Sequence, residues 1–154
     1  MDGVKRKLKI VLASSHGGHL TEILALKDVF HGHDCFYITY KGKTTGELEP
    51  AYRFGLYFKN PVLFFTIWFS LIRIFLKERP DVIFSTGAEL AIPVFYVAKI
   101  LFGCRLIYLE CSAQVEAPSL TGRIVYPITD LFLVQWEPLL KRYGKKARWR
   151  GGLI

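Results

Sequence analysis

The sequence predicts a doubly wound α/β domain, on two observations. Short runs of consecutive apolar residues, rich in β-branched and aromatic types, alternate along the chain with longer segments whose apolar residues recur at helical spacing. Strands that are apolar on both faces are typical of a parallel sheet covered by helices on both sides. The 154 residues suffice for one hydrophobic core and show no internal repeat, so we expect a single domain over 1–154.

The first quarter of the chain is predicted to contain two strands and one helix. Leu8–Ala13 is an apolar run that ends in a polar loop, as a buried strand does. Leu20–Phe30 carries apolar residues at helical spacing, and Gly32 is a natural stop for that helix. Cys35–Tyr40 is the second strand, and we expect a polar connection without regular structure over residues 41–60.

The middle of the chain is predicted to form two apolar helices around a third strand. The first helix spans Pro61–Arg79 and is stopped by Pro80. Asp81–Ser85 is the strand, and Ala88–Phe102 is an almost wholly apolar helix broken or kinked by Pro93.

The last third repeats the alternation in shorter elements. Arg105–Cys111 and Asp130–Val134 are the fourth and fifth strands. Leu120–Tyr126 and Glu137–Tyr143 are short helices, and Ala147–Trp149 is an edge strand. These elements complete one parallel sheet.

Composition narrows the class of protein. Lys and Arg number 21 against 13 Asp and Glu, a net charge of +8, which favours an anionic partner such as nucleic acid, an acidic membrane surface or substrate phosphates. The 3 cysteines lack CxxC spacing and are expected to be reduced. No apolar run reaches the ~20 residues of a membrane span, and the basic amino terminus is too short in apolar residues for a signal peptide. We expect a protein of the cytoplasm or of the cytoplasmic face of a membrane.

The candidate site lies where the strands end. In open α/β sheets ligands bind outside the carboxyl ends of the strands. The loop after the first strand holds Ser15, His16, Gly17 and Gly18 directly before a helix, an arrangement that suits a phosphate. It is neither GxGxxG nor a Walker A loop, so we expect no nucleotide cofactor there. The alternative is a tight turn without a ligand.

His19 is the first candidate for a general base, or for a hydrogen-bond donor that orients a hydroxyl, because histidine side chains ordinarily have a pKa near neutrality, which suits removal of a hydroxyl proton. His16 and His19 lie three residues apart without a third ligand at a characteristic spacing, so we expect no metal. Glu110 lies at the end of the fourth strand and Glu116 in the loop after it; they are the second choice for the base, although Glu116 could equally be a solvated loop charge. The remaining candidates for the binding site are Thr86, Gly87, Glu89 and Arg123, the last of which could instead face water.

The helix from Pro61 has more apolar surface than one sheet face can cover. Its polar residues form one narrow stripe at Thr66, Ser70, Arg73 and Lys77. We expect part of the remainder to contact a membrane surface, and the alternative is that neighbouring loops bury it. The residues expected to reach lipid are Phe64, Phe65, Trp68, Phe69 and Ile72.

Three segments carry a family resemblance. They are SHGGHLTEIL, STGAELAIP and the long run YLECSAQVEAPSLTGRIVYPITDLFLVQW, followed by the final GGLI. With these the chain resembles the membrane-anchoring subunit of a eukaryotic two-component transferase, which adds the second N-acetylglucosamine to dolichol-diphosphate N-acetylglucosamine. It is also similar to bacterial capsule and exopolysaccharide proteins of the PssD type. The resemblance runs from Ile10 to Ile154. We expect no counterpart of the eukaryotic subunit's N-terminal membrane helix in this chain, with the Pro61 helix as its substitute.

The resemblance implies a split GT-B glycosyltransferase. This chain would be the Rossmann-like, acceptor-binding N-terminal half, and a separate subunit would bind the nucleotide sugar. The fused relative is the peptidoglycan enzyme that makes lipid II, which has a similar Gly-Gly-His loop. By that analogy Gly17, Gly18 and His19 face a lipid-diphosphate-linked saccharide, which receives a sugar from a UDP-sugar with inversion and without a metal or other cofactor. Leu153 and Ile154 would lie against the partner subunit, and the alternative is that they fold back onto this domain's own sheet.

Two other functions remain open from the sequence. One is a non-catalytic partner that recruits and stabilises a catalytic subunit. The other is nucleic-acid binding, which is disfavoured because the basic residues do not cluster with exposed aromatic residues in any RNA-reading motif. We therefore expect a peripheral protein at the cytoplasmic face of the membrane that binds no nucleic acid.

Overall fold

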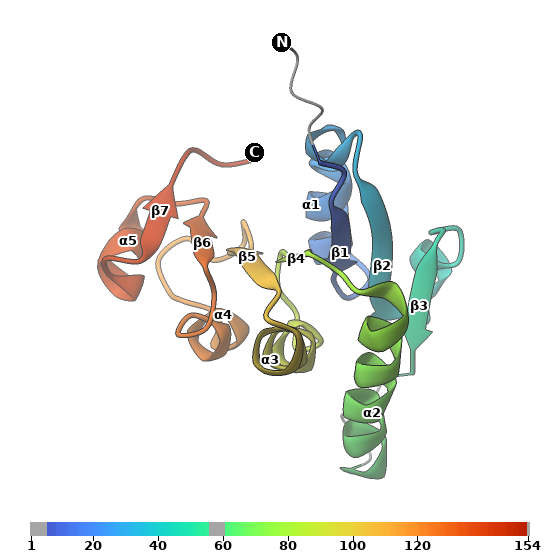
Figure 1. Cartoon of the computed structure of the whole chain (residues 1–154). Coiled ribbons are helices and arrows are strands. Elements are labelled where there is room, and N and C mark those ends of the chain that lie inside the picture. The colour runs from blue at the N-terminus through green and yellow to red at the C-terminus, as the bar shows by residue number, and fades with distance from the viewer. Residues whose placement is uncertain (1–5, 56–60, 154) are drawn as a thin grey trace.

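A parallel sheet of seven strands forms the centre of the protein (Figure 1). The computed structural model describes residues 6–55 and 61–153, and the side chains of these ranges except 61–64. The strand order is β3-β2-β1-β4-β5-β6-β7, and every neighbouring pair is parallel. The strands are β1 Lys9–Ala13, β2 Asp34–Tyr40, β3 Ala51–Phe54, β4 Val82–Ser85, β5 Arg105–Leu109, β6 Leu131–Val134 and β7 Ala147–Trp149. The predicted fold class is confirmed.

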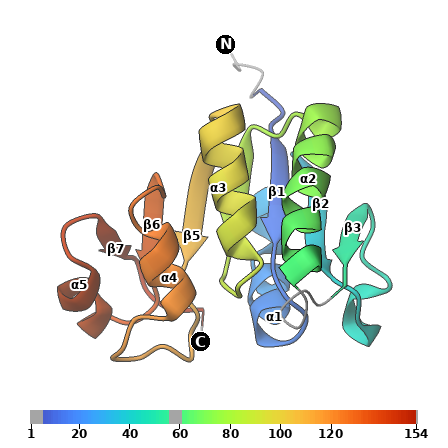
Figure 2. The same cartoon turned by 90° about the horizontal axis from the view of Figure 1, so that it is seen from below.

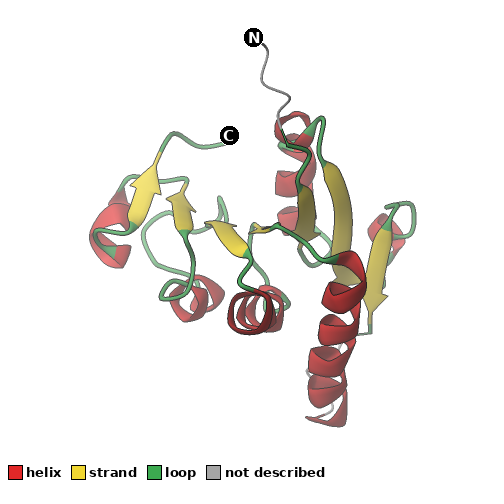
Figure 3. Cartoon of the chain, viewed as in Figure 1, coloured by secondary structure: helices red, strands yellow, loops and turns green. Residues whose placement is uncertain are grey.

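Helices lie on both faces of this sheet, but unevenly. In Figures 1 and 2, α2, α3 and α4 lie on one face and α1 on the other, and Figure 3 shows the same separation of helices from strands. The α-helices are α1 Gly18–Ala25, α2 Pro61–Glu78, α3 Ala91–Phe102, α4 Leu120–Val125 and α5 Pro138–Tyr143. Two 3₁₀ turns, η1 Lys27–Phe30 and η2 Lys43–Thr45, complete the described elements. The helix predicted over 20–30 is therefore α1 followed by η1.

The main core lies between the sheet and the helices α2 and α3. Alternate strand residues such as Val11, Ile83 and Leu106 are fully buried there against Leu71 and Phe95. A smaller cluster on the other face packs α1 and η1 against β1 and β4. Because one face holds most of the helices, most of the apolar surface is buried on that side.

The second face is left open over β5 and β6. An apolar groove of about 350 Å³ runs there between η1 and the carboxyl-terminal tail. Its lining includes Leu26, Val29, Phe30, Ile107, Leu109, Leu131, Leu133 and Leu153. The expectation that helices cover both faces thus holds only over the β1 side of the second face.

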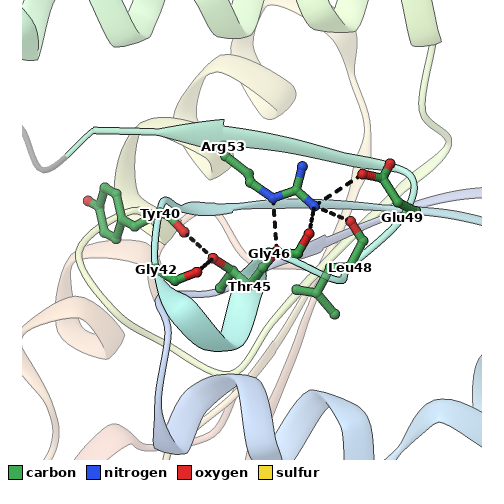
Figure 4. Close-up of polar contacts among 7 residues, drawn as sticks. All are labelled: Tyr40, Gly42, Thr45, Gly46, Leu48, Glu49 and Arg53. Atoms are coloured by element: carbon green, nitrogen blue, oxygen red, sulfur yellow. Dashed lines mark hydrogen bonds and ion pairs between the residues drawn. The ribbon is translucent and has the colours of Figure 1, made fainter.

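Strand β3 lies within the segment predicted to be a polar connection. Its Arg53 crosses back over the preceding loop and donates hydrogen bonds to the carbonyl oxygens of Thr45 (2.8 Å), Gly46 (3.1 Å) and Leu48, and it forms an ion pair with Glu49 (Figure 4). One guanidinium group therefore satisfies several loop carbonyls and holds β3 at the edge of the sheet.

The direction in which successive strands are added to the sheet reverses between β1 and β4, which are parallel neighbours in the middle of the strand order. After β1 the chain continues to β2 and β3, and after β4 to β5, β6 and β7. Loops that leave neighbouring strands to opposite sides open a crevice at the carboxyl edge of an α/β sheet. This edge carries the loop 14–18 and the segment 86–89, which the sequence singled out.

Candidate functional site

His19 is held at the carboxyl edge of the sheet by Thr86. The His19 ring Nδ1 lies 3.0 Å from the Thr86 carbonyl oxygen, and the Thr86 hydroxyl donates to the His19 carbonyl oxygen at 2.7 Å. A carbonyl oxygen only accepts hydrogen bonds, so Nδ1 carries the proton in this contact. In the neutral ring Nε2 is then the unprotonated nitrogen, which is the form that can accept a proton.

Gly87 makes room for the His19 ring. Its φ is +125°, and a Cβ at this position would lie 2.8 Å from His19 Cε1 and 3.0 Å from Nδ1. Any side chain would therefore force the ring to move, in addition to the backbone strain of that φ. The two predicted residues therefore both position His19: Thr86 forms hydrogen bonds with it, and Gly87 leaves space for its ring.

A cavity of about 340 Å³ opens beside His19. It is lined by His19, Ala88, Glu89, Tyr108, Cys111, Ala113, Gln114, Ser119, Leu120 and Thr121. These residues come from α1, from the ends of β4 and β5, and from the beginning of α4. The structure therefore brings together His19 and Glu89, as the sequence predicted, in one hollow.

The Gly-Gly loop itself is exposed. Gly17 is the N-cap of α1 with φ +90°, and no side chain of the described ranges caps the helix. A Cβ at Gly17 or Gly18 would meet no atom within 4 Å, so a ligand can approach this backbone closely. His16 is also exposed, whereas Ser15 is half-buried and its hydroxyl donates to the His16 carbonyl oxygen at 3.2 Å. The geometry fits an anion at a helix N-terminus.

Glu110 lies at the end of β5 and is fully buried. Its carboxylate accepts hydrogen bonds from the backbone N–H groups of Cys111 (3.0 Å) and Ser119 (3.2 Å), from the Ser119 hydroxyl (3.0 Å) and from the Tyr143 hydroxyl. Burial, and then the hydrogen bond to Glu110, raise the pKa of Tyr143 well above its usual range, so it stays a donor. Glu110 does not line the cavity, so we interpret it as the residue that ties β5 to α4 and α5 rather than as a base.

Two further predicted residues lie away from His19. Glu116 is exposed and lines a separate hollow of about 500 Å³ with Glu137, Lys141 and Arg142. Arg123 is an exposed residue of α4. The structure does not bring either side chain into the cavity beside His19.

Glu22 is a member of the site that the sequence analysis missed. His19, Glu22 and Cys111 each offer a ligand-type atom, and these atoms lie within 4.8 Å of one another. A tetrahedral zinc site with bonds of 2.0–2.3 Å has ligand atoms roughly 3.5 Å apart, so these side chains would have to move together to hold an ion. The sequence feature that could have indicated Glu22 is the position of its carboxylate between the buried residues Leu20 and Ile23, on an otherwise apolar helix face.

The long helix α2 presents only part of the predicted membrane surface. Phe65 and Phe69 are 65% and 69% exposed, whereas Trp68 and Ile72 are half-buried against the main core. The side chain of Phe64 lies outside the described residues. Trp68 and Ile72 pack partly against the core, which leaves less of each side chain for a lipid contact than the sequence predicted. Within the described ranges, no helix has both the length and the apolarity needed to cross a membrane.

The carboxyl-terminal tail borders the apolar groove. Leu153 is 37% exposed and lines the groove, and its backbone N–H donates to the Gln135 side-chain oxygen at 3.0 Å. Ile154 lies outside the described residues.

Comparisons with solved structures agree with this architecture. The chain resembles MurG of Acinetobacter baumannii with a TM-score of 0.76 at 16% identity, covering 96% of this chain and 46% of that one. It resembles UDP-GlcNAc 2-epimerase of Methanocaldococcus jannaschii with a TM-score of 0.65 at 13% identity, covering 96% and 46%. These similarities support a Rossmann-like fold for this chain, which matches slightly less than half of each solved chain.

Sequence comparison is more specific. UDP-N-acetylglucosamine transferase subunit ALG14 of Candida albicans is 39% identical over 90 residues, which are 55% of this chain and 41% of that protein. The subunit of the same name from Mus musculus is 32% identical over 89 residues, or 54% and 41%, and that from Yarrowia lipolytica is 31% identical over 113 residues, or 70% and 52%. The chain spans about two fifths to one half of the length of these relatives. Residues 57–153 match the family described as "Oligosaccharide biosynthesis protein Alg14 like", and the chain therefore belongs to the Alg14-like family of oligosaccharide biosynthesis proteins.

Proposed function

We propose that this chain is the acceptor-binding, membrane-associated subunit of a two-component glycosyltransferase. It would act in polysaccharide or glycan biosynthesis, at the cytoplasmic face of the membrane, with a separate subunit that binds a UDP-sugar. The acceptor would be a saccharide linked to a lipid diphosphate. The observation that carries the proposal is the family membership together with one Rossmann-like sheet that matches less than half of the MurG chain. Transfer assays with and without a donor-binding subunit test it.

The acceptor would lie between the Gly-Gly loop and the cavity beside His19. The exposed backbone of Gly17 and Gly18 can donate to a phosphate, and the cavity of about 340 Å³ has room for part of a sugar. Nε2 of His19 would accept the proton of the attacking hydroxyl while that oxygen bonds to the donor sugar and UDP leaves. Glu89 also lines this cavity and would orient the sugar. UDP-N-acetylglucosamine is the first donor to test, because the relatives from three organisms carry it in their names.

Membrane attachment would use the outer stripe of α2. Phe65, Phe69 and Leu76 are exposed at spacings of four and seven, which places them on one side of the helix. Exposed Ile100 and Leu101 lie on the neighbouring helix α3. Clustered exposed apolar residues on a basic protein are typical of a contact with an anionic membrane surface.

Replacing Phe65 and Phe69 with Glu is expected to weaken binding to anionic phospholipid vesicles by about a hundredfold or more. Each phenylalanine that leaves lipid loses roughly 2 kcal/mol of apolar burial. Vesicle sedimentation measures the binding, and circular dichroism checks that the variant is folded. Val29→Glu is the matched control, since Val29 is as exposed as Phe69 but lies on the other face of the sheet. Equal binding by the double variant and the wild type would exclude α2 as the membrane contact.

The donor-binding subunit would dock over the open groove on β5 and β6. A sheet face with half-buried Ile107 and Leu133 and exposed Leu153 is incompletely covered in this chain. Truncation after Gly152 is expected to weaken the affinity for the donor subunit about a hundredfold, because two apolar side chains contribute roughly 3 kcal/mol. Surface plasmon resonance measures the affinity, and the melting temperature of the isolated chain should barely change. Leu120→Ala, an exposed leucine away from the groove, is the control. A lower melting temperature with unchanged affinity would instead place the tail in this domain's own core.

A non-catalytic recruiting role remains the second candidate. It is favoured by the burial of Glu110, which removes one of the two carboxylates expected as an alternative base. In that case the chain would hold a catalytic subunit at the membrane, and substitution of His19 would not change the rate.

A further inference from the structure

A buried polar contact joins the helix that carries His19 to the carboxyl-terminal tail. Glu22 in α1 and Gln135 after β6 are 8% and 3% exposed, and Gln135 Nε2 lies 3.2 Å from Glu22 Oε1. The other end of the same amide, Gln135 Oε1, accepts the backbone N–H of Leu153 at 3.0 Å. One side chain thus touches the proposed catalytic helix and the proposed docking segment.

The chemistry of the neighbours fixes the orientation of this amide. Nε2 faces two groups that only accept, the Glu22 carboxylate and the Glu110 carbonyl oxygen at 3.1 Å. Oε1 faces a group that only donates, the Leu153 N–H. Turning the amide over would place oxygen against oxygen and N–H against N–H, so one arrangement is possible. No other uncharged side chain of similar length donates at one end and accepts at the other.

Glu22 lies close to His19 on the same helix. It lies three residues after His19, on the same side of α1, and one of its oxygens belongs to the group of atoms within 4.8 Å that includes a His19 ring nitrogen. Glu22 Oε1 also accepts the backbone N–H of Ser112 at 2.8 Å, which ties α1 to the loop after β5. Among the residues that the structure describes, Glu22 Oε2 is buried without a hydrogen-bond partner, so the carboxylate relies on the contacts of its other oxygen.

We propose that Gln135 and Glu22 are positioning residues that hold α1, and with it His19. The position of α1 would depend on whether Leu153 in the carboxyl-terminal tail is hydrogen-bonded to Gln135. The inference rests on the proposed function for the role of His19, but the coupling itself is a property of the folded chain. A partner that covers the tail would shield the bond from Leu153 to Gln135 from water. Gln135 would then hold Glu22, and Glu22 would hold the helix. Docking of the donor-binding subunit would then stabilise the Gly-Gly loop at the start of α1, and an ordered Gly-Gly loop would in turn favour docking.

Gln135→Met tests the first half of the link, because methionine is similar in size and has neither amide group. Hydrogen–deuterium exchange of the full chain is expected to be at least about tenfold faster for the amides of α1, which lose the contacts of Glu22. The amides of α3, on the other face of the sheet, should keep their exchange rates. Thr129→Val is the matched control: the buried Thr129 hydroxyl donates to the Val125 carbonyl oxygen, outside the contact. Glu22→Gln is a second variant. Its side-chain oxygen can still accept from Gln135, so exchange in α1 should stay closer to that of the wild type than in Gln135→Met.

Truncation after Gly152 tests the second half. It should speed exchange in α1 of the wild type but add nothing in Gln135→Met, since the amide through which the tail acts is already gone. In the reconstituted transferase, Gln135→Met should lower kcat more than it changes the KM of the UDP-sugar. Unchanged exchange in α1, or equal acceleration of α1 and α3, would overturn the positioning role. Additive effects of truncation and Gln135→Met would overturn the link to the tail. The exchange measurements need no sugar transfer, so they stand even if the proposed reaction is wrong.

Discussion

Purified without a second subunit, the chain is expected to transfer no sugar from any UDP-sugar to a lipid-diphosphate acceptor. Its cavity beside His19 is open and lies on one Rossmann-like sheet that matches 46% of the MurG chain. Transfer between two substrates depends on holding the hydroxyl and the donor sugar together, and the loss of that positioning lowers rates by many orders of magnitude. We expect the isolated chain to be at least about 10³-fold slower than the complex.

The measurement is radiolabelled transfer from UDP-N-acetylglucosamine to a short-chain polyprenyl-diphosphate saccharide. The chain alone, the donor-binding subunit alone and the mixture are compared at equal concentration. The truncation after Gly152 is a useful fourth sample, because it should reduce the activity of the mixture most at low concentration, where fewer complexes form. Turnover by the isolated chain at the rate of the mixture would contradict a split enzyme.

Much of the fold could be predicted because its central strands, β1 and β4, are buried on both faces of the sheet. Runs such as Leu8–Ala13 and Asp81–Ser85 are apolar apart from Lys9, Asp81 and Ser85, and they coincide with β1 and β4 to within one residue at each end. Strand β3 was missed because Ala51–Phe54 is short and contains Arg53, whose charge is explained only by the loop carbonyls that it contacts. Local sequence does not show such a contact.

Only those residues of the site that directly follow a strand in the sequence could be predicted. His19 and Thr86 were found because both follow strands, and neighbouring parallel strands bring their carboxyl ends to one edge. Glu22 and Gln135 were missed because their contact spans 113 positions in the chain. Trp68 was placed in the membrane surface because an apolar helix does not show which of its sides meets the sheet.

His19→Ala is expected to lower kcat of the assembled transferase by roughly 10²-fold or more, while partner affinity and folding stay unchanged. The ring lies half-exposed in the cavity, and its Nδ1–H contact with the Thr86 carbonyl leaves Nε2 to accept a proton. His31→Ala is the matched control, because His31 is exposed in the turn before β2, at the opposite edge of the sheet. Gly87→Ala should act in the same direction as His19→Ala although it keeps the imidazole, since the new Cβ would displace the ring.

Two further variants separate proton transfer from orientation. His19→Gln keeps a side chain that can hydrogen-bond to the acceptor, so it should retain much of the activity if His19 only orients the hydroxyl, and little if it removes the proton. A change of less than about threefold in His19→Ala would exclude both roles. The search for a base would then move to Glu116, whose carboxylate is exposed, before Glu110, whose two oxygens already accept hydrogen bonds within the fold. If Glu116→Gln were equally silent in the active complex, the base would lie in the donor subunit, and this chain would serve by binding the acceptor and its partner.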